Sequence, residues 1–140
     1  MITEKAKAVI DTNVVISAAI SKEGIPAKIL MNLAKGDFEN YTTQDIISEI
    51  KGIFGRNDIK NIVSYGYGEF LLANFAKYSI LIVPLTDEKV IIEDKTDDKF
   101  INCALTAKAD IVSGDRHLLK LRKYKGVNIL SPREFLERLK

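Results

Sequence analysis

The sequence predicts a three-layer α/β/α fold, in which helices cover both faces of a central parallel sheet of four to five strands. Short β-rich runs alternate with stretches of helical periodicity along the chain, a pattern typical of βαβ units and parallel sheets. The length of 140 residues fits one domain. No internal repeat, low-complexity run or Pro/Gly/Ser-rich linker marks a boundary. We therefore expect a single domain over residues 1–140.

The first half of the chain predicts two strands and four helical stretches. Pro26 suits the first turn of a helix. Thr42, with Asp45 three residues later, resembles a capping box that opens the next helix. Gly66 and Gly68 predict an interruption in the helical stretch that follows. The expected elements are a strand at Ala6–Ile10 with a helical pattern to Ile20, a helix from Pro26 to Gly36, a strand at Phe38–Thr42, a helix to Phe54 and helical sequence to Lys77.

The second half predicts three strands and three helices. The continuous apolar run Ser79–Leu85 is rich in β-branched residues, which is typical of a strand buried on both faces. Thr96 suits the N-cap of a helix to Ala107. Ser131 and Pro132 supply an N-cap and a first-turn proline for the last helix. The other expected elements are strands at Ile111–Ser113 and Val127–Leu130, with a short helix after Asp115.

Composition excludes several classes of protein. No apolar run approaches the roughly 20 residues of a membrane span, and Asp11 directly follows the first apolar stretch, so no secretory signal is predicted. The single cysteine, Cys103, cannot form an internal disulfide, and the single histidine, His117, cannot build a zinc site alone. We expect a cytoplasmic protein in which Cys103 is a small core residue.

Charge is distributed unevenly along the chain. From Arg116 to the C-terminus, eight Lys and Arg face two Glu, a net charge of +6, whereas residues 1–115 carry 13 basic and 17 acidic residues, a net charge of −4. A basic face opposite an acidic site would suit a polyanionic substrate that also needs a metal. A solvated, lysine-rich surface helix explains the same pattern, so both interpretations stay open here.

Four acidic residues stand out by their placement. Asp11 follows the first predicted strand and Asp115 follows the fourth, so both are expected at the carboxyl edge of the sheet, where functional groups gather. Asp98 lies in the first turn of the helix before that fourth strand, and Glu49 falls about 40° outside the apolar arc of its own helix. If the four carboxylates converge, a hard cation such as Mg²⁺ or Mn²⁺ would offset their repulsion.

Each of these acids also has a purely structural interpretation. Asp98 could stabilise a helix dipole, and Glu49 could simply flank the buried face of its helix. Asp11 and Asp115 could cap the helices that follow them. We interpret the neighbouring acids Glu93, Asp94 and Asp97 as part of a solvated loop. Asp97 could also adjust the charge of the site.

At these residues the sequence resembles the PIN domain family. The resemblance is carried by VIDTNVVISA (9–18), SEI (48–50), DDKFINCALTAKAD (97–110) and VSGDRHLL (112–119). The tail VNILSPREFL (127–136) matches the subgroup described as toxin components of toxin–antitoxin systems. The resemblance implies a PIN-like fold and a metal-dependent ribonuclease directed at single-stranded RNA and related to VapC-type toxins. Such proteins are often dimeric and often held inactive by a cognate antitoxin.

The resemblance also implies roles for individual residues. Four match the family's acidic residues, which would bind one or two Mg²⁺ or Mn²⁺ ions and carry catalysis: Asp11, Glu49, Asp98 and Asp115. Three match neighbouring polar positions, of which the first two would orient the carboxylates: Asn13, Ser113 and Thr12. His117 stands where many relatives carry an acid or amide, and we interpret it as an exposed or phosphate-contacting side chain. Four basic residues are candidates for contacts to the RNA backbone: Lys120, Arg122, Lys123 and Lys125.

Two other classes of function remain to be weighed. The chain could be a catalytically silent PIN-like protein, an interaction subunit of an RNA-processing complex. It could also be another doubly wound protein with an Asp after its first strand. A phosphotransfer receiver needs a Lys at the end of its fifth strand, where Leu130-Ser131-Pro132 offers none. A haloacid-dehalogenase-like phosphatase needs a second Asp where Asn13 stands, and no GxGxxG phosphate loop is present.

Overall fold

The computed structural model describes residues 4–90 and 97–140, and its centre is a six-stranded sheet in the order β3-β2-β1-β4-β6-β5. The strands are β1 (Ala6–Ile10), β2 (Phe38–Thr42), β3 (Ser79–Leu81), β4 (Asp110–Val112), β5 (Lys123–Tyr124) and β6 (Val127–Leu130). Every pairing is parallel except that of β5 with β6. The predicted α/β class is confirmed. The sheet has more than the expected four to five strands because β5 and β6 form a short hairpin.

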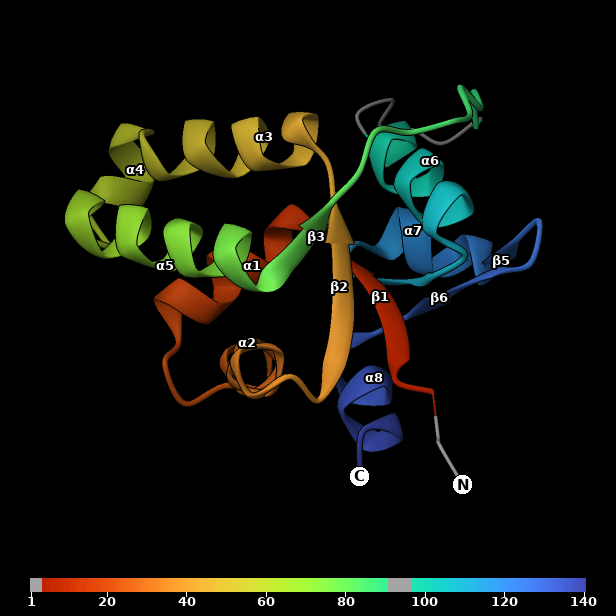
Figure 1. Cartoon of the computed structure of the whole chain (residues 1–140). Helices are drawn as coiled ribbons and strands as arrows, with labels where there is room; N and C mark the ends of the chain where they lie inside the picture. Colours follow the sequence, from red (N-terminus) through yellow and green to blue (C-terminus); the bar gives the residue numbers. More distant parts are fainter. Residues whose placement is uncertain (1–3, 91–96) are drawn as a thin grey trace.

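Helices flank this sheet on both sides (Figure 1). They are α1 (Thr12–Ile20), α2 (Ile25–Lys35), α3 (Gln44–Phe54), α4 (Asn57–Lys60), α5 (Tyr65–Tyr78), α6 (Asp98–Ala107), α7 (Arg116–Leu121) and α8 (Pro132–Arg138). Figure 1 shows α1, α3 and α5 on one side of the sheet and α6 on the other, which is the layered arrangement predicted. None of the helices in the described ranges is long and apolar enough to cross a membrane.

The caps of α3 and α8 follow from short polar side chains. Thr43, rather than Thr42, caps α3: its hydroxyl accepts a hydrogen bond from Ile46 N at 3.3 Å. The prediction of Thr42 was wrong by one residue because Thr42 is the buried last residue of β2. Ser131 caps α8 as predicted, in a reciprocal capping box with Glu134. The predicted cap at Thr96 lies outside the described residues.

The interruption in the long helical stretch lies at residues 61–64, between α4 and α5, and not at the two glycines. Both glycines are inside α5. A Cβ on Gly68 would lie 2.8 Å from Cδ1 of Phe54, so Gly68 lets α5 approach α3 closely. Ser64 begins α5 instead, because its hydroxyl accepts a hydrogen bond from Tyr67 N at 3.2 Å.

The strand predicted at Ser79–Leu85 is wrong in both length and burial. β3 ends at Leu81 and lies at the edge of the sheet, and among the described residues it pairs only with β2. Ile80, Leu81, Val83 and Leu85 are exposed, the last two by more than four-fifths (81% and 85%). An apolar run alone does not distinguish a central strand from an edge strand.

The sheet order reverses at β1 and β4, which are neighbours although they are far apart in sequence. From β1 the chain moves outward to β2 and β3, then crosses to β4 on the other side of β1. Asp11 N donates to the carbonyl of Val112 at 2.9 Å, and Ser113 N donates to that of Leu130 at 2.9 Å. These bonds join the carboxyl ends of β1, β4 and β6 at the point where parallel sheets commonly bind ligands.

The core packs around the central strands, and α6 supplies part of it. Val9, Ile111, Phe100 and Ile101 are at most 1% exposed. Cys103 is fully buried, and burial raises the pKa of its thiol to about 12. The prediction of Cys103 as a core residue is confirmed, and its thiol is chemically inert because it stays protonated at neutral pH.

Candidate functional site

Two of the four predicted acids, Asp11 and Asp115, are joined through the hydroxyl of Ser113. Ser113 Oγ donates to Asp11 Oδ2 at 2.6 Å and accepts a hydrogen bond from Asp115 N at 2.9 Å. Ser113 is 0% exposed, so the surrounding core fixes the direction of this hydroxyl. The fold thus places the residues after β1 and after β4 side by side, as their positions at the strand ends predict.

Both acids also cap the helices that follow them. Asp11 is the N-cap of α1 and accepts a hydrogen bond from Asn13 N at 3.4 Å, and Asp115 is the N-cap of α7 and accepts one from His117 N at 2.8 Å. The structural and functional interpretations of these residues therefore do not compete. Capping fixes the orientation of each carboxylate, and a helix N-terminus favours negative charge.

Asp11 is a carboxylate in an unfavourable environment for its charge. It is 2% exposed, and its pKa is raised from the ordinary 3.8 to about 6. Burial is the main cause, and the negative charges of Glu49 and Asp115 raise the pKa further, against the hydrogen bonds from Ser113 and Asn13. A cation placed here would oppose each of the raising effects, because it stabilises the ionised carboxylate.

Glu49 lies on α3 at the border of the buried face, as the helical periodicity predicts, and is half-buried. Its charge acts on Asp11, so it faces the same region from the helix after β2. Its carboxylate is ion-paired, however, because Lys99 Nζ on α6 donates to Glu49 Oε2.

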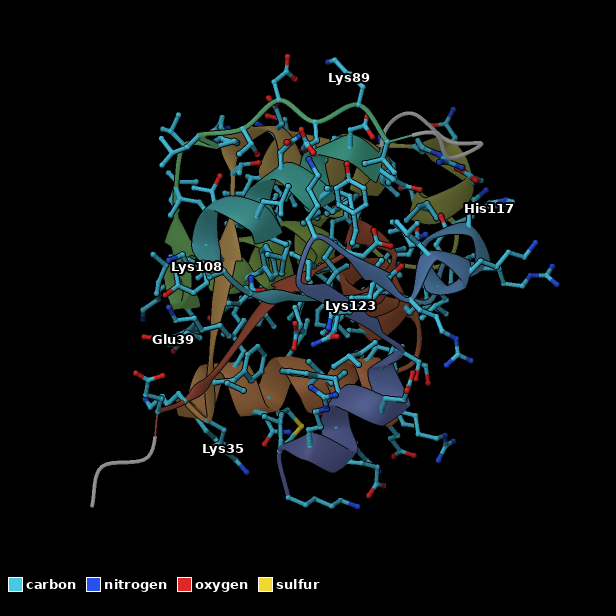
Figure 2. All side chains as sticks on the ribbon, turned by 90° about the vertical axis from the view of Figure 1, so that its right-hand side faces the viewer. Lys35, Glu39, Lys89, Lys108, His117 and Lys123 are labelled. Atoms are coloured by element: carbon cyan, nitrogen blue, oxygen red, sulfur yellow. The ribbon has the colours of Figure 1, made fainter. Side chains whose placement is uncertain are left out.

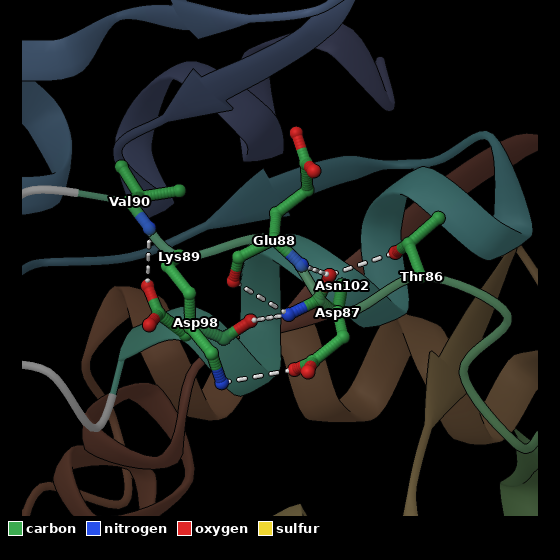
Figure 3. A network of polar contacts seen from close by, with 7 residues as sticks. All are labelled: Thr86, Asp87, Glu88, Lys89, Val90, Asp98 and Asn102. Carbon is green, nitrogen blue, oxygen red and sulfur yellow. Dashed lines mark hydrogen bonds and ion pairs between the residues drawn. The ribbon is translucent and has the colours of Figure 1, made fainter.

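Asp98 is turned toward the segment after β3 (Figure 3). Its Oδ1 accepts a hydrogen bond from Val90 N at 3.1 Å. The neighbouring Asn102, one helical turn later, holds the same segment: its Oδ1 accepts from Thr86 Oγ1 and from Glu88 N, both at 2.7 Å. Its Nδ2 donates to the carbonyl of Glu88 at 3.2 Å. Asp98 and Asn102 together fasten residues 86–90 to α6.

We expect Asn102→Ala to destabilise the protein by about 2 kcal/mol, because the part-buried N–H of Glu88 and the hydroxyl of Thr86 both lose their acceptor. Chemical denaturation with urea measures this loss. Asn74→Ala is the matched control, since the side chain of Asn74 makes an exposed hydrogen bond to the carbonyl of Phe70 within its own helix; it should change stability by less than about 0.5 kcal/mol. Equal effects of the two substitutions would contradict a fastening role for Asn102.

The four acids are not all within reach of one ion. Across residues 4–90 and 97–140, no three His, Cys, Asp or Glu side chains are close enough to hold a metal together. The expectation of a four-carboxylate pocket is therefore not met by the side chains. Asp11 and Asp115 are joined, the charge of Glu49 acts on Asp11, and Asp98 contacts Val90. Strand ends fix backbone positions, whereas side-chain directions depend on partners elsewhere in the fold.

The chemistry of the region nevertheless fits a hard divalent cation. The donors at the switch point are carboxylate and hydroxyl oxygens, which Mg²⁺ and Mn²⁺ prefer. Thr12, next to Asp11, is 1% exposed, and within the part of the chain that the structure describes its Oγ1 has no hydrogen-bond partner. Asp11 and Asp115 are thus the two of the four acids that the fold links directly, through Ser113.

Other acidic and polar residues near the site differ from expectation. Asp97 is buried (4% exposed) and is not part of a solvated loop, because it directly precedes α6, whose first turn packs into the core. Glu93 and Asp94 lie outside the described residues. His117 is half-buried on α7 rather than exposed. Asn13 is exposed and contributes its backbone N–H to Asp11, and an orienting role for its side chain stays a prediction.

The four basic residues proposed for RNA contacts are all exposed: Lys120, Arg122, Lys123 and Lys125. Figure 2 looks onto the face where Lys123 and His117 lie. Lys125 is ion-paired with Glu88, which also accepts a hydrogen bond from Tyr124 at 2.9 Å. The hairpin of β5 and β6 is therefore tied to the segment that Asp98 and Asn102 fasten.

One supporting residue was not found by sequence analysis. Asn40, in the middle of β2, is 0% exposed. Its Oδ1 accepts a hydrogen bond from Ile10 N at 2.9 Å, and its Nδ2 donates to Ser79 Oγ at 2.9 Å. Asn40 thereby secures the end of β1 directly before Asp11. A polar residue in a short strand normally indicates a solvated face, so no sequence signal marked it as buried.

An apolar groove of about 370 Å³ lies between α2 and α5, away from these acids. It is lined by residues such as Leu30 and Met31 of α2 and Phe70 and Tyr78 of α5, and by none of the four acids. Met31 and Phe70 are 58% and 63% exposed. Contiguous exposed apolar side chains of this kind commonly mark an interaction surface.

Comparison with known proteins gives related sequences and folds. Residues 7–117 match the family model described as PIN domain. "Uncharacterized protein MJ1680" of Methanocaldococcus jannaschii is 38% identical over 151 aligned positions, covering 95% of this chain and 91% of that protein.

Two solved structures share the fold. PAE2754 from Pyrobaculum aerophilum has a TM-score of 0.67 at 15% identity, covering 96% of this chain and 89% of that one. VapBC2 from Rickettsia felis, solved bound to a DNA fragment from its promoter, has a TM-score of 0.62 at 14% identity, covering 89% and 98%. PIN domains are in general nucleases that use divalent metal ions. By its sequence match and by its fold, this chain belongs to the PIN domain family.

Proposed function

We propose that this protein is a metal-dependent endoribonuclease that hydrolyses RNA phosphodiester bonds, and that it is the toxin component of a toxin–antitoxin system. The observation that carries the proposal is the linked pair Asp11 and Asp115, joined by Ser113 at the switch point of the sheet. Burial and neighbouring carboxylates disfavour the charge of Asp11, and a hard cation is the partner that relieves this cost.

Different residues of the chain would have different roles in the proposed reaction. Asp11 and Asp115 would hold the ion, Asp98 would complete its coordination, and Glu49 would orient its water. A bound Mg²⁺ or Mn²⁺ supplies an activated water and stabilises negative charge on the phosphoryl and leaving oxygens. Ser113 keeps the two inner acids in place through its two hydrogen bonds. The exposed basic residues of α7 and β5 would attract the RNA backbone without choosing a sequence.

The proposal also includes the molecules that this protein would bind. VapBC2 supports an antitoxin partner by its name and by its fold similarity. The groove between α2 and α5 offers exposed apolar side chains for a protein partner. We propose a cognate antitoxin, a homodimeric state, single-stranded or structured RNA as substrate, and a cytoplasmic location.

A second candidate function is a catalytically silent PIN-like subunit of an RNA-processing complex. The observation that favours it is the engagement of two of the four acids within the protein: Glu49 with Lys99 and Asp98 with Val90. A protein whose acids are held by its own side chains and backbone would keep the fold without the activity.

Cleavage of labelled single-stranded RNA separates the two candidates. We expect the full chain to cut RNA with Mn²⁺ and to stop when the metal is chelated. Asp98→Asn should slow cleavage by at least about tenfold, because one carboxylate of the site loses its charge. Asp87→Asn is the control, since Asp87 is an exposed acid of the neighbouring segment, and it should leave the rate unchanged.

Three results would contradict the proposed activity: cleavage that persists under chelation, equal rates for Asp98→Asn and the wild type, or no cleavage by a folded wild-type chain. The last of these would favour the silent subunit. Circular dichroism on the same samples establishes that each variant is folded.

A further inference from the structure

Lys99 places a positive charge inside the acidic region, next to one of the carboxylates expected to bind metal. Its Nζ donates to Glu49 Oε2 from the first turn of α6, across the space between α6 and α3. We infer that Lys99 is a built-in cation of the site: its ammonium takes the place beside Glu49 where a second divalent ion would bind, so the chain holds a single ion. This inference rests on the proposed function, since it concerns the same carboxylates.

The pair is enclosed rather than superficial. The side chains of Lys99 and Glu49 are 22% and 27% exposed, whereas the surface pair of Lys89 and Asp87 is 77% and 84% exposed. An enclosed ion pair is maintained by the mutual attraction of its members, and removing either one leaves a poorly solvated charge. The contact between Lys99 and Glu49 is thus a defined feature of the interior edge of the site.

The position of Lys99 is not explained by the stability of its helix. It is the second residue of α6, and a cation in the first turn opposes the positive end of the helix dipole. The first turn of a helix favours acidic residues, such as Asp98 directly before Lys99. The ammonium therefore interacts unfavourably with the N-terminus of α6, and the carboxylate of Glu49 offsets this effect.

The two halves of the acidic region differ in charge as a result. Glu49 and Lys99 form a neutral pair, while Asp11 and Asp115 are joined by a neutral hydroxyl and lie at the N-termini of two helices. A divalent ion therefore gains most at Asp11 and Asp115, and a second ion at Glu49 would have to displace the ammonium.

Manganese titration of the full chain tests this inference by the number of ions bound. Isothermal calorimetry should show one Mn²⁺ per wild-type chain. Lys99→Met keeps the alkyl stem but removes the charge, and it should bind a second Mn²⁺ at least roughly tenfold more tightly than any second event in the wild type, because the repelling ammonium is gone. Adding Glu49→Gln to Lys99→Met should abolish that second site.

Lys89→Met is the matched control, since Lys89 also pairs with an acid but is exposed, and it should titrate like the wild type. Thermal unfolding gives a second readout. Without metal, Lys99→Met should unfold at a lower temperature than the wild type, and saturating Mn²⁺ should raise its midpoint by more than it raises that of the wild type. If Lys99→Met does not fold, Lys99→Gln serves, because its amide still donates to Glu49.

Two wild-type ions, or the same number and affinity of ions with and without Lys99, would overturn this inference while leaving the proposed nuclease intact. No Mn²⁺ binding by the folded wild-type chain would instead overturn the proposed function, and the role of Lys99 with it. One ion in the wild type and two in Lys99→Met would support both.

Discussion

Asp11→Asn should lower the rate of Mn²⁺-dependent RNA cleavage by about a thousandfold. Asp11 is the most buried of the four acids and is fixed by bonds from Ser113 and Asn13. Its replacement by a neutral amide removes a charge from the inner pair that would hold the ion. Metal ions contribute several kcal/mol to such reactions, and about 1.4 kcal/mol corresponds to tenfold in rate. Single-turnover cleavage of a labelled RNA measures the effect.

Asp37→Asn is the control for this experiment, since Asp37 is an exposed acid directly before β2. It should cleave at the wild-type rate. If Asp11→Asn retains more than about a tenth of the activity while binding RNA normally, the reaction does not depend on the carboxylate at the end of β1.

The second large effect of Asp11→Asn is on stability: the substitution should lower activity but raise the free energy of unfolding. In the metal-free protein the pKa of Asp11 is raised from 3.8 to about 6, so the folded chain holds this proton more tightly than the unfolded chain does. The contribution of Asp11 to stability is complete below pH 4 and is lost as the pH rises through about 6. The shift corresponds to about 3 kcal/mol at neutral pH.

Asp11→Asn removes this titration, because the amide stays neutral. Relative to the wild type, the variant should therefore gain up to about 3 kcal/mol in unfolding free energy between pH 4 and pH 7. Urea denaturation in the presence of chelator measures both proteins across this range, and taking their difference cancels the titration of the other acids. Parallel pH profiles for the two proteins would show that Asp11 does not carry a destabilising charge.

Together these two results would show that the charge of Asp11 lowers the stability of the fold and is required for activity. The same charge that costs the metal-free fold several kcal/mol is the one that would hold the ion. Substitutions that remove it are expected to stabilise the chain and abolish its activity, which is a common relation between active sites and stability.

The backbone positions of the site residues could be predicted from local sequence patterns. Asp11 directly follows β1 and Asp115 lies just beyond the end of β4, and parallel strands end at one edge of a sheet, so their proximity needed no knowledge of tertiary contacts. The border position of Glu49 followed from helical periodicity in the same way. The strand at residues 79–85 failed because an apolar run does not reveal whether a second strand lies beside it.

The directions of the side chains could not be derived in this way. Glu49 turns to Lys99, which is 50 residues away in sequence, and Asp98 turns to a backbone N–H of the segment after β3. Asn40 and Asn102 support the site through hydrogen bonds to other elements. Such pairings arise only when helices and strands meet, so a single sequence carries no periodic signal for them.

The central claim is that Asp11 and Asp115, joined by Ser113, hold a hard divalent cation at the carboxyl edge of β1 and β4. Anomalous diffraction from a crystal soaked in Mn²⁺ tests it most directly. We expect one strong peak within about 2.3 Å of a carboxylate oxygen of Asp11 and of Asp115. A well-diffracting soaked crystal with no peak at this edge, or with Mn²⁺ bound only to other residues, would contradict the claim.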